Sequence, residues 1–370
     1  MTPPLDTALR ALSRLDSRGV RLWGPGLARA TLHREAPVAG APVHLYVCVA
    51  DHFEPRWRRP SLEEERRRVG EWKTRYPALA DRHRDSFGRA HVRTLFFPVE
   101  EYRPEHLDDI AALRDEGLVD VEVHLHHERD TAENLRETLV GFAELLHRDH
   151  GMLRRDPDTG KVTWAFIHGN WALDNSHPEG LYCGVDDELS VLVDAGCYCD
   201  MTLPCVPSPA QGRVVNTIYY AKSEPGRSRG HDHGRAVYVG GAPRENELLM
   251  IPGPLGLHWR SRAKGLVPRV EAGMLEPENP VPHELRVEAW VKNSPAVRGA
   301  PNHRFIKLHA HGCNGDAPEW FLTPDGPFDR LLTELESRYA DTREYVLHYV
   351  TAREMYETVK ALEEGALANA

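Results

Sequence analysis

The sequence predicts an α/β fold of the barrel kind, and two observations predict it. Apolar runs of strand length alternate with amphipathic segments of helix length over most of the chain. This alternation is typical of parallel βαβ units, in which a helix connects each strand to the next. Four apolar runs also end in polar residues, at 51–52, 124–127, 168–171 and 309–311. Because the active sites of barrels lie at the carboxyl ends of the strands, these endings predict an enzyme site there.

The regular elements follow an irregular, proline- and glycine-bearing lead-in over residues 1–42. The run 43–50 is continuously apolar, as expected of a strand that is buried on both faces. Ser61, with Glu64 three residues on, begins the next helix in a capping-box pattern. The expected strands are 43–50, 92–97, 119–125, 162–167, 198–203, 304–309 and 344–350. The expected helices are 61–80, 104–116, 131–150, 186–194, 283–293, 326–339 and 351–364. We therefore expect one barrel domain over 43–365.

Residues 204–282 interrupt the alternation. They are rich in proline, glycine and short β-like pieces, and no linker bounds them. We expect an insertion of loops and short strands over the barrel mouth, not a separate domain. The insertion contains His231-Asp232-His233, for which a solvated loop is the simplest interpretation.

Composition narrows the function classes. The 370 residues carry a formal net charge of -10, which argues against non-specific binding of nucleic acid. No apolar run approaches the roughly 18 residues of a transmembrane helix, and no secretory signal is seen, so we expect a cytoplasmic protein with reduced cysteines. Glycine-rich phosphate loops and the Gly-x-Ser-x-Gly nucleophile motif are absent from the sequence, which disfavours dehydrogenases, kinases and serine hydrolases.

The histidine-rich end of the strand 119–125 is the most informative feature of the chain. His124 and His126 share one face of this strand, and His127 points to the other. Asp130 follows, directly before Thr131, the expected N-cap of the next helix. Two imidazoles and a carboxylate at a strand end are typical of a divalent metal site. The alternative is that these histidines are satisfied by hydrogen bonds inside the barrel.

Two other strand ends supply groups for acid-base chemistry. Asp51 and His52 follow the first strand, and Glu54 adds a carboxylate before the chain leaves. A carboxylate at this position can ligate a metal or act as a general base. His309 and His311 share one face of a later strand, and each can be a ligand or a general acid.

The loop after the strand 162–167 combines polar and aromatic residues. His168, Asn170 and Trp171 suit the recognition of a sugar, because an indole can stack on the apolar face of the ring while the polar side chains bind hydroxyls. A packed corner of the fold is the alternative.

In this order, the motifs resemble those of the NodB-type polysaccharide deacetylases, carbohydrate esterase family four and its relatives. Val49-Ala50-Asp51-His52 stands where that family has two aspartates, so Asp51 matches its general base and His52 replaces a ligand. His126 matches the first of two metal histidines, and Asp130 replaces the second. Residues 167–171 occupy the position of the third motif, and Lys307-Leu308-His309-Ala310-His311 fits the final Leu-x-His motif. The resemblance covers about 43–365, apart from the middle segment.

The resemblance implies a distorted (β/α)7-type barrel and a metal-dependent hydrolase. Its reaction would remove an acetyl or similar acyl group from an N-acylated amino sugar or saccharide precursor. Asp51 would take the proton of the attacking water, and His309 or His311 would protonate the leaving amine. The implied metal ligands are three of His52, His124, His126 and Asp130, and the implied substrate contacts are His168, Asn170 and Trp171.

The implied cofactor is one divalent metal ion, with zinc first and cobalt, nickel, iron or manganese as alternatives. Two other functions stay open. One is a barrel metallohydrolase of the amidohydrolase or PHP kind, in which His-x-His also occurs at a strand end. The other is a catalytically inactive barrel that binds a saccharide or a partner protein.

Overall fold

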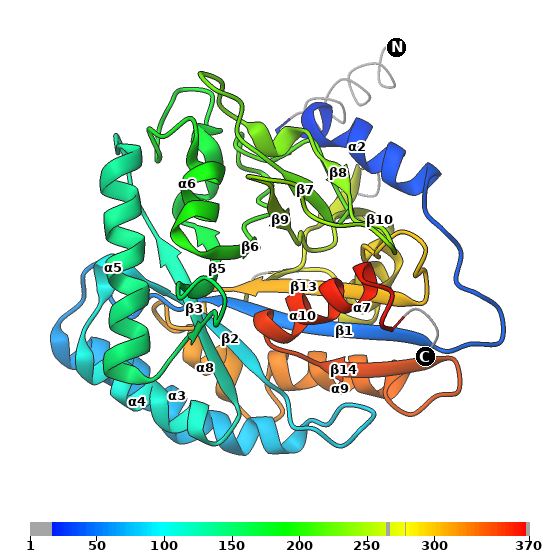
Figure 1. Ribbon diagram of the computed structural model, residues 1–370. Helices are drawn as coiled ribbons and strands as arrows, with labels where there is room; N and C mark the ends of the chain where they lie inside the picture. The colour runs from blue at the N-terminus through cyan, green and yellow to red at the C-terminus, as the bar shows by residue number, and fades with distance from the viewer. Residues whose placement is uncertain (1–16, 264–266, 278, 368–370) are drawn as a thin grey trace, which may run out of the picture.

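The computed structural model describes residues 17–263, 267–277 and 279–367. It is an α/β fold with a large, mostly parallel sheet flanked by helices (Figure 1). The strands are β1 (Val43–His52), β2 (Arg93–Pro98), β3 (Val119–Leu125), β4 (Arg154–Arg155), β5 (Val162–His168), β6 (Cys197–Asp200), β7 (Tyr219–Ala221), β8 (Arg235–Ala236), β9 (Leu248–Met250), β10 (Gly256–Ala263), β11 (Val267–Glu271), β12 (Met274–Leu275), β13 (His303–Ala310) and β14 (Tyr345–Tyr349). The α-helices are α2 (Val20–Leu32), α3 (Leu62–Arg82), α4 (Pro104–Asp115), α5 (Ala132–His150), α6 (Glu188–Ala195), α7 (His283–Asn293), α8 (Ala317–Leu322), α9 (Pro327–Tyr339) and α10 (Ala352–Glu363).

The main sheet has the strand order β12-β13-β1-β2-β3-β5-β6-β9-β7-β8. Neighbouring strands from β12 to β9 are parallel, and β7 and β8 extend the sheet in antiparallel pairing. The predicted α/β class with parallel strands is confirmed. Among the described residues the pairings form a path that ends at β12 and β8, so closure into a barrel stays a prediction.

Strand β1 lies at the centre of the sheet. It pairs with β13 along one edge, and along the other edge its first half pairs with β14 and its last residues with β2. Its side chains alternate between two cores. Val47 and Val49 join one core with Trp72 of α3, and Cys48 and Ala50 join the other. Burial on both faces explains why this run is continuously apolar.

Helices flank the sheet. Figure 1 shows α3, α4, α8 and α9 along the lower side and α5 along the left. The predicted caps of two of these helices are confirmed: the Ser61 hydroxyl accepts a hydrogen bond from Glu64 N at 3.2 Å, and the Thr131 hydroxyl accepts one from Asn134 N at 3.2 Å. No described helix is both long and apolar enough to cross a membrane.

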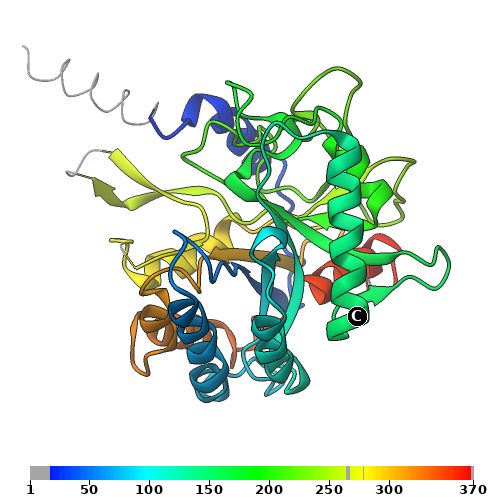
Figure 2. The ribbon, with the colours of Figure 1, turned by 90° about the vertical axis from the view of Figure 1, so that its left-hand side faces the viewer.

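The segment 204–282 differs from the predicted insertion over the barrel mouth. Its strand β9 pairs in parallel with β6 and joins it to β7, so the segment extends the central sheet itself. Among the described strands, β10 and β11 alone pair apart from that sheet, as a two-stranded hairpin that projects from the body in Figure 2. Residues 264–266 and 278 of this segment lie outside the described residues.

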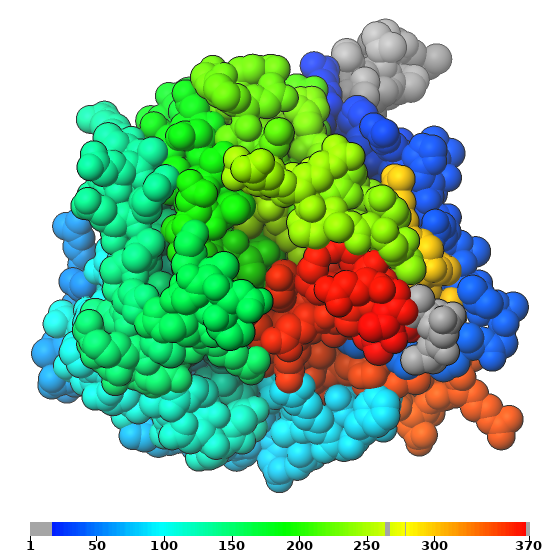
Figure 3. Space-filling model, in the orientation of Figure 1, coloured from blue at the N-terminus to red at the C-terminus, as the bar shows by residue number. Residues whose placement is uncertain are grey.

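Both ends of the described chain pack against the 204–282 segment. Trp23 of α2 is fully buried against Val215 and Leu255, which anchors the described part of the lead-in, while residues 1–16 lie outside the described residues. At the other end, Gly240 N donates to Glu363 O at 2.7 Å. Figure 3 shows this C-terminal segment, in red, beside the yellow-green surface around residue 240. The predicted outer limits of the domain, 43–365, stay a prediction.

A buried carboxyl group makes the stability of this fold depend on pH. Glu122 of β3 is 1% exposed, and it accepts hydrogen bonds from Ala165 N at 2.6 Å and from the Tyr198 hydroxyl. Burial raises the pKa of Glu122 to about 8. The folded chain therefore binds a proton that the unfolded chain releases between the ordinary carboxyl pKa and about pH 8, and stability falls as pH rises through this window.

We expect the Glu122→Gln variant to have a higher Tm than wild type at pH 8, with the difference shrinking toward pH 5. The glutamine oxygen can accept from Ala165 N, its amide can donate to the Tyr198 oxygen, and it carries no charge to desolvate. Thermal melts at several pH values check this, with the exposed Glu137→Gln as control. Parallel curves of Tm against pH for Glu122→Gln and wild type would contradict it.

Candidate metal centre and substrate cavity

The carboxyl ends of β1, β3 and β13 bring the rings of His52, His124 and His311 together. In the register of the sheet, Ala50 of β1 pairs with His309 of β13, so the strands end at one level. The His52 ring centroid lies 4.8 Å from that of His124 and 4.6 Å from that of His311. His52 and His311 are 259 positions apart in the chain, and the parallel register of β1 and β13 makes them neighbours.

A cavity of about 430 Å³ lies at these strand ends. Its size falls in the range of small-ligand sites. Acidic, basic and aromatic side chains line it together, which suits a polar ligand with both hydroxyl and ionic groups. The lining residues are His52, Glu54, Arg56, Trp57, Arg58, Arg59, Glu100, Glu101, His126, Asn170, Trp171 and His311.

Three side chains are arranged as metal ligands. His52, Glu54 and His124 each offer one ligand atom, and these atoms all lie within 4.8 Å of one another. His124 Nδ1 is 2.7 Å from Ile167 O, a carbonyl that can only accept, so Nδ1 carries a hydrogen. His124 Nε2 is buried without a hydrogen-bond partner and lies 3.4 Å from Glu54 Oε1. If the imidazole is neutral, the unprotonated Nε2 directs its lone pair at a carboxylate oxygen. This arrangement is unfavourable unless a cation lies between the nitrogen and the oxygen.

The charges of this group also suit a cation. Burial acts to raise the pKa of Glu54, but the neighbouring His124, His311 and His126 outweigh it and hold the pKa at about 2. Glu54 is therefore ionised, and its Oε2 accepts from Asn314 Nδ2 at 3.0 Å. Burial, reinforced by the other histidines, keeps the pKa of His52 well below its ordinary value. An ionised Glu54 and a neutral His52 are the protonation states in which these two residues bind metals.

Two further histidines at the cavity have their pKa values moved in opposite directions. Burial acts to lower the pKa of His126, but the hydrogen bond to Glu100 and the charges of Glu100 and Glu54 raise it overall. His126 Nδ1 lies 2.6 Å from Glu100 Oε1, which fixes the ring. Burial lowers the pKa of His311. A pair of groups separated in this way can supply both a proton donor and a proton acceptor.

Asp51 is not brought to the cavity. Because side chains alternate along β1, it lies on the face opposite to His52 and Glu54. Its Oδ2 is 2.6 Å from Arg93 Nη2, its Oδ1 accepts from Gly312 N at 2.6 Å, and both side chains of the ion pair are fully buried. This placement does not fit the role of general base that the sequence predicted, since the carboxylate contacts neither the cavity nor solvent.

Two other predicted residues lie in a different group. Asp130, one of the four ligand candidates from the sequence, has its Oδ2 3.1 Å from His127 Nδ1 and does not belong to the group of His52, Glu54 and His124. His168 is fully buried and faces Glu188, away from the cavity, which does not fit contact with a substrate. Asp130 lies beyond the end of β3, where strand alternation no longer applies, and His168 is the last residue of β5.

The remaining predicted residues lie at or below the cavity. Asn170 and Trp171 line it, and the Trp171 ring centroid is 6.3 Å from that of His311. His309 is buried and does not line the cavity; its ring centroid lies 6.4 Å from that of His52. Of the two histidines that the sequence left open as the proton carrier, only His311 is therefore open to a bound molecule.

Several cavity residues were missed by the sequence reasoning. The sequence predicts Glu54 only as an additional carboxylate, although its i, i+2 spacing places it on the same face as His52. Glu100 and Glu101 follow the end of β2 after Val99, so an acidic pair just beyond a strand was the available signal. Burial raises the pKa of Glu101 to about 7. Nothing in the sequence, apart from their position after β1, indicates that Arg56, Arg58 and Arg59 line the cavity.

No family model and no curated protein sequence matches this chain. Among solved structures, it is similar to a "putative polysaccharide deacetylase from Mycobacterium smegmatis", with a TM-score of 0.45, 12% sequence identity, and 89% of this chain and 94% of that chain covered. It is also similar to a 4-alpha-glucanotransferase from Thermococcus litoralis, with a TM-score of 0.34, 9% identity, and 86% and 40% of the two chains covered. Similarities at this level assign no family, so the function is inferred from the side chains of the site.

Proposed function

We propose that this chain is a metal-dependent hydrolase that removes an acetyl or similar acyl group from an N-acylated amino sugar or saccharide precursor. The observation that carries the proposal is the buried His124 Nε2, which makes no hydrogen bond and lies 3.4 Å from Oε1 of Glu54, a residue that lines the cavity. Ligand-competent groups at the carboxyl ends of parallel strands, beside a cavity of small-ligand size, favour catalysis there.

His52, Glu54 and His124 would hold one divalent metal ion. Their nitrogen and oxygen ligands suit zinc first, with cobalt, nickel, iron or manganese as alternatives. A metal at this position would polarise the acyl carbonyl and make a bound water a stronger nucleophile. Three protein ligands leave a coordination position for that water, as catalytic zinc sites require.

The other histidines of the cavity would move the protons. His311, whose pKa is lowered by burial, is neutral near pH 7 and can take a proton from the attacking water. His126, whose pKa Glu100 helps to raise, can donate a proton to the departing amine. This assignment replaces Asp51 as the base, because the Asp51 carboxylate lies against Arg93 on the other face of β1.

The cavity wall suits a sugar. Trp171 offers an aromatic ring near His311, Asn170 offers an amide, and Glu100 and Glu101 offer acceptors for hydroxyl groups. Arg56, Arg58 and Arg59 line the same cavity and would bind an anionic group, such as the phosphate of an activated sugar. The same arginines favour a phosphoesterase as the second candidate function.

Reconstitution with metal and a small substrate panel test the proposal. The purified chain is loaded with Zn²⁺, Co²⁺ or Mn²⁺ and incubated with N-acetylglucosamine, its nucleotide-diphosphate form and a chitooligosaccharide. Acetate release is measured beside phosphate release from sugar phosphates. Acetate release supports the proposal, and phosphate release alone would favour the second candidate.

We expect Glu54→Gln to bind one equivalent of metal less than wild type and to release no acetate. The glutamine keeps the shape of the side chain but loses the charge that attracts the cation. Elemental mass spectrometry and the acetate assay check this, with Glu128→Gln, an exposed position on the nearby loop after β3, as control. Full metal content in Glu54→Gln, or no hydrolysis by the loaded wild type, would contradict the proposal and favour an inactive binding fold.

A further inference from the structure

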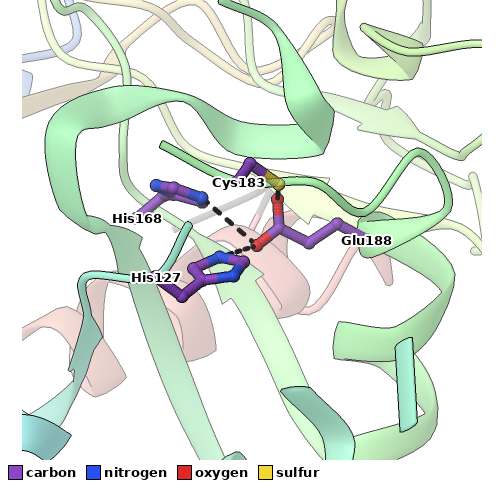
Figure 4. A group of neighbouring side chains, drawn as sticks. All are labelled: His127, His168, Cys183 and Glu188. Carbon is purple, nitrogen blue, oxygen red and sulfur yellow. Dashed lines mark hydrogen bonds and ion pairs between the residues drawn. The ribbon is translucent and has the colours of Figure 1, made fainter. Parts of the chain in front are cut away.

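A second group of metal-ligating side chains lies apart from the cavity. His127, His168, Cys183 and Glu188 each offer one ligand atom, and these atoms all lie within 4.8 Å of one another. Figure 4 shows the two imidazoles and the thiol directed at the Glu188 carboxylate. None of the four lines the cavity described above. His127 follows β3, His168 ends β5, Cys183 lies in the loop after β5, and Glu188 begins α6.

Each histidine ring is oriented by an oxygen acceptor at its Nδ1 atom. His127 Nδ1 is 3.1 Å from Asp130 Oδ2, while Asp130 Oδ1 accepts hydrogen bonds from Thr131 N and Asn134 Nδ2, each at 2.7 Å. His168 Nδ1 contacts Gly169 O. An oxygen acceptor therefore holds Nδ1 of each ring and leaves Nε2 directed at Glu188. Histidines that bind metals are oriented in this way by carboxylates and carbonyls.

The distances from the Glu188 carboxylate to the other three groups are close to those between ligand atoms of a zinc ion. Glu188 Oε1 lies 3.1 Å from His127 Nε2 and 3.5 Å from His168 Nε2, and Glu188 Oε2 lies 3.4 Å from Cys183 Sγ. Ligand atoms bound to zinc at ~2.0–2.3 Å in tetrahedral geometry are separated by roughly 3.3–3.7 Å.

A hydrogen-bond network around Glu188 explains only part of this arrangement. Glu188 can accept from His127, from the Cys183 thiol and from Asp174 N, which lies 2.5 Å from Oε2. His168 remains unexplained, because its ring is fully buried and its Nε2 has no hydrogen-bond partner, although it points at the carboxylate. A bound cation would satisfy this nitrogen and the carboxylate together.

We propose that His127, His168, Cys183 and Glu188 form a structural zinc site. Four protein ligands of nitrogen, sulfur and oxygen type leave no open position for a substrate, as in structural zinc sites. The site joins the ends of β3 and β5 to the start of α6 and thereby ties both ends of the loop that carries Asn170 and Trp171. It stands independently of the proposed hydrolase activity.

The loop that this site ties down has an unfavourable backbone. Asn170, Trp171, Asp174 and Asn175 have φ values of 54°, 60°, 53° and 51°. Residues other than glycine rarely adopt these angles, and the surrounding structure must hold them there. His168 lies at one end of this loop, and Cys183 and Glu188 lie at the other, so an ion between them would keep Trp171 at the cavity.

The absorption spectrum of bound Co²⁺ tests for this site without an activity assay. The chain is freed of metal, loaded with Co²⁺ alone and examined by absorption spectroscopy. We expect a thiolate-to-cobalt charge-transfer band in the near ultraviolet, together with visible bands of tetrahedral cobalt. The band should disappear in Cys183→Ser and persist in Cys205→Ser, a matched control because Cys205 is also a buried free cysteine and is not one of the four ligands.

The same spectra separate the two metal proposals. The group of His52, Glu54 and His124 contains no sulfur, so Glu54→Gln should keep the thiolate band while losing one metal equivalent. Zn²⁺ should also raise the Tm of the metal-free Glu54→Gln protein. Wild-type protein that binds Co²⁺ without a thiolate band, or a band that persists in Cys183→Ser, would overturn the structural site. If Cys183→Ser fails to fold, the presence or absence of the thiolate band in the wild-type spectrum still tests the structural site.

Discussion

The His311→Ala variant is expected to lose about 10²–10⁴-fold in kcat for acetate release and to keep its metal content, since this is the usual contribution of a general base. His311 lines the cavity, and its ring centroid lies 4.6 Å from that of the proposed ligand His52. It is not one of the three grouped ligands, so its removal should leave the cation bound.

Kinetics and elemental analysis of the same preparation check this prediction. Added imidazole should restore part of the activity of His311→Ala, because the missing base can diffuse into the space of the lost ring. The His309→Gln variant serves for comparison, since His309 does not line the cavity and should keep its kcat within about tenfold, a modest loss beside that of a removed general base. Loss of metal together with activity in His311→Ala would identify His311 as a ligand, and an unchanged kcat would exclude it as the base.

The Asp51→Asn variant is expected to lower the free energy of unfolding by about 3–5 kcal/mol, as is typical when one partner of a buried ion pair is removed. Both Asp51 and Arg93 are fully buried. The Arg93 guanidinium lies 4.5 Å from the ring centroids of Trp72 and Phe321, and its Nε and Nη1 have no hydrogen-bond partner. Without the carboxylate charge, the guanidinium is left in an apolar layer with only weak partners.

Denaturant unfolding of Asp51→Asn and of the double variant Asp51→Asn/Arg93→Met checks this effect. The double variant should lose less stability than the single one, because it also removes the Arg93 charge, which the single variant leaves buried without its partner. The folded fraction of Asp51→Asn should keep its metal and most of its kcat. Wild-type stability with abolished hydrolysis would restore Asp51 to the role of general base.

Much of the architecture was predictable because it rests on local patterns. The run 119–125 coincides with β3, and the predicted helix 131–150 matches α5 with its Thr131 cap. The segment 204–282 was harder, since its strands have two to eight residues and too little periodicity to show which sheet they join. The pairing of β9 with β6 depends on a contact about fifty residues apart.

The sequence by itself determined that strands of a parallel sheet end in histidines and carboxylates. Apolar runs of strand length, and the helical segments that connect them, can be recognised from neighbouring residues alone. Strand alternation also brought His124 and His126 to one face, where their ring centroids lie 4.7 Å apart. Only the tertiary structure decided which strand-end residues share a site. It placed Asp51 against Arg93, Asp130 behind His127, and His168 beside Cys183 and Glu188. Those placements depend on the turn that follows each strand and on the residues packed around it, and neither is encoded in the periodicity of a single strand.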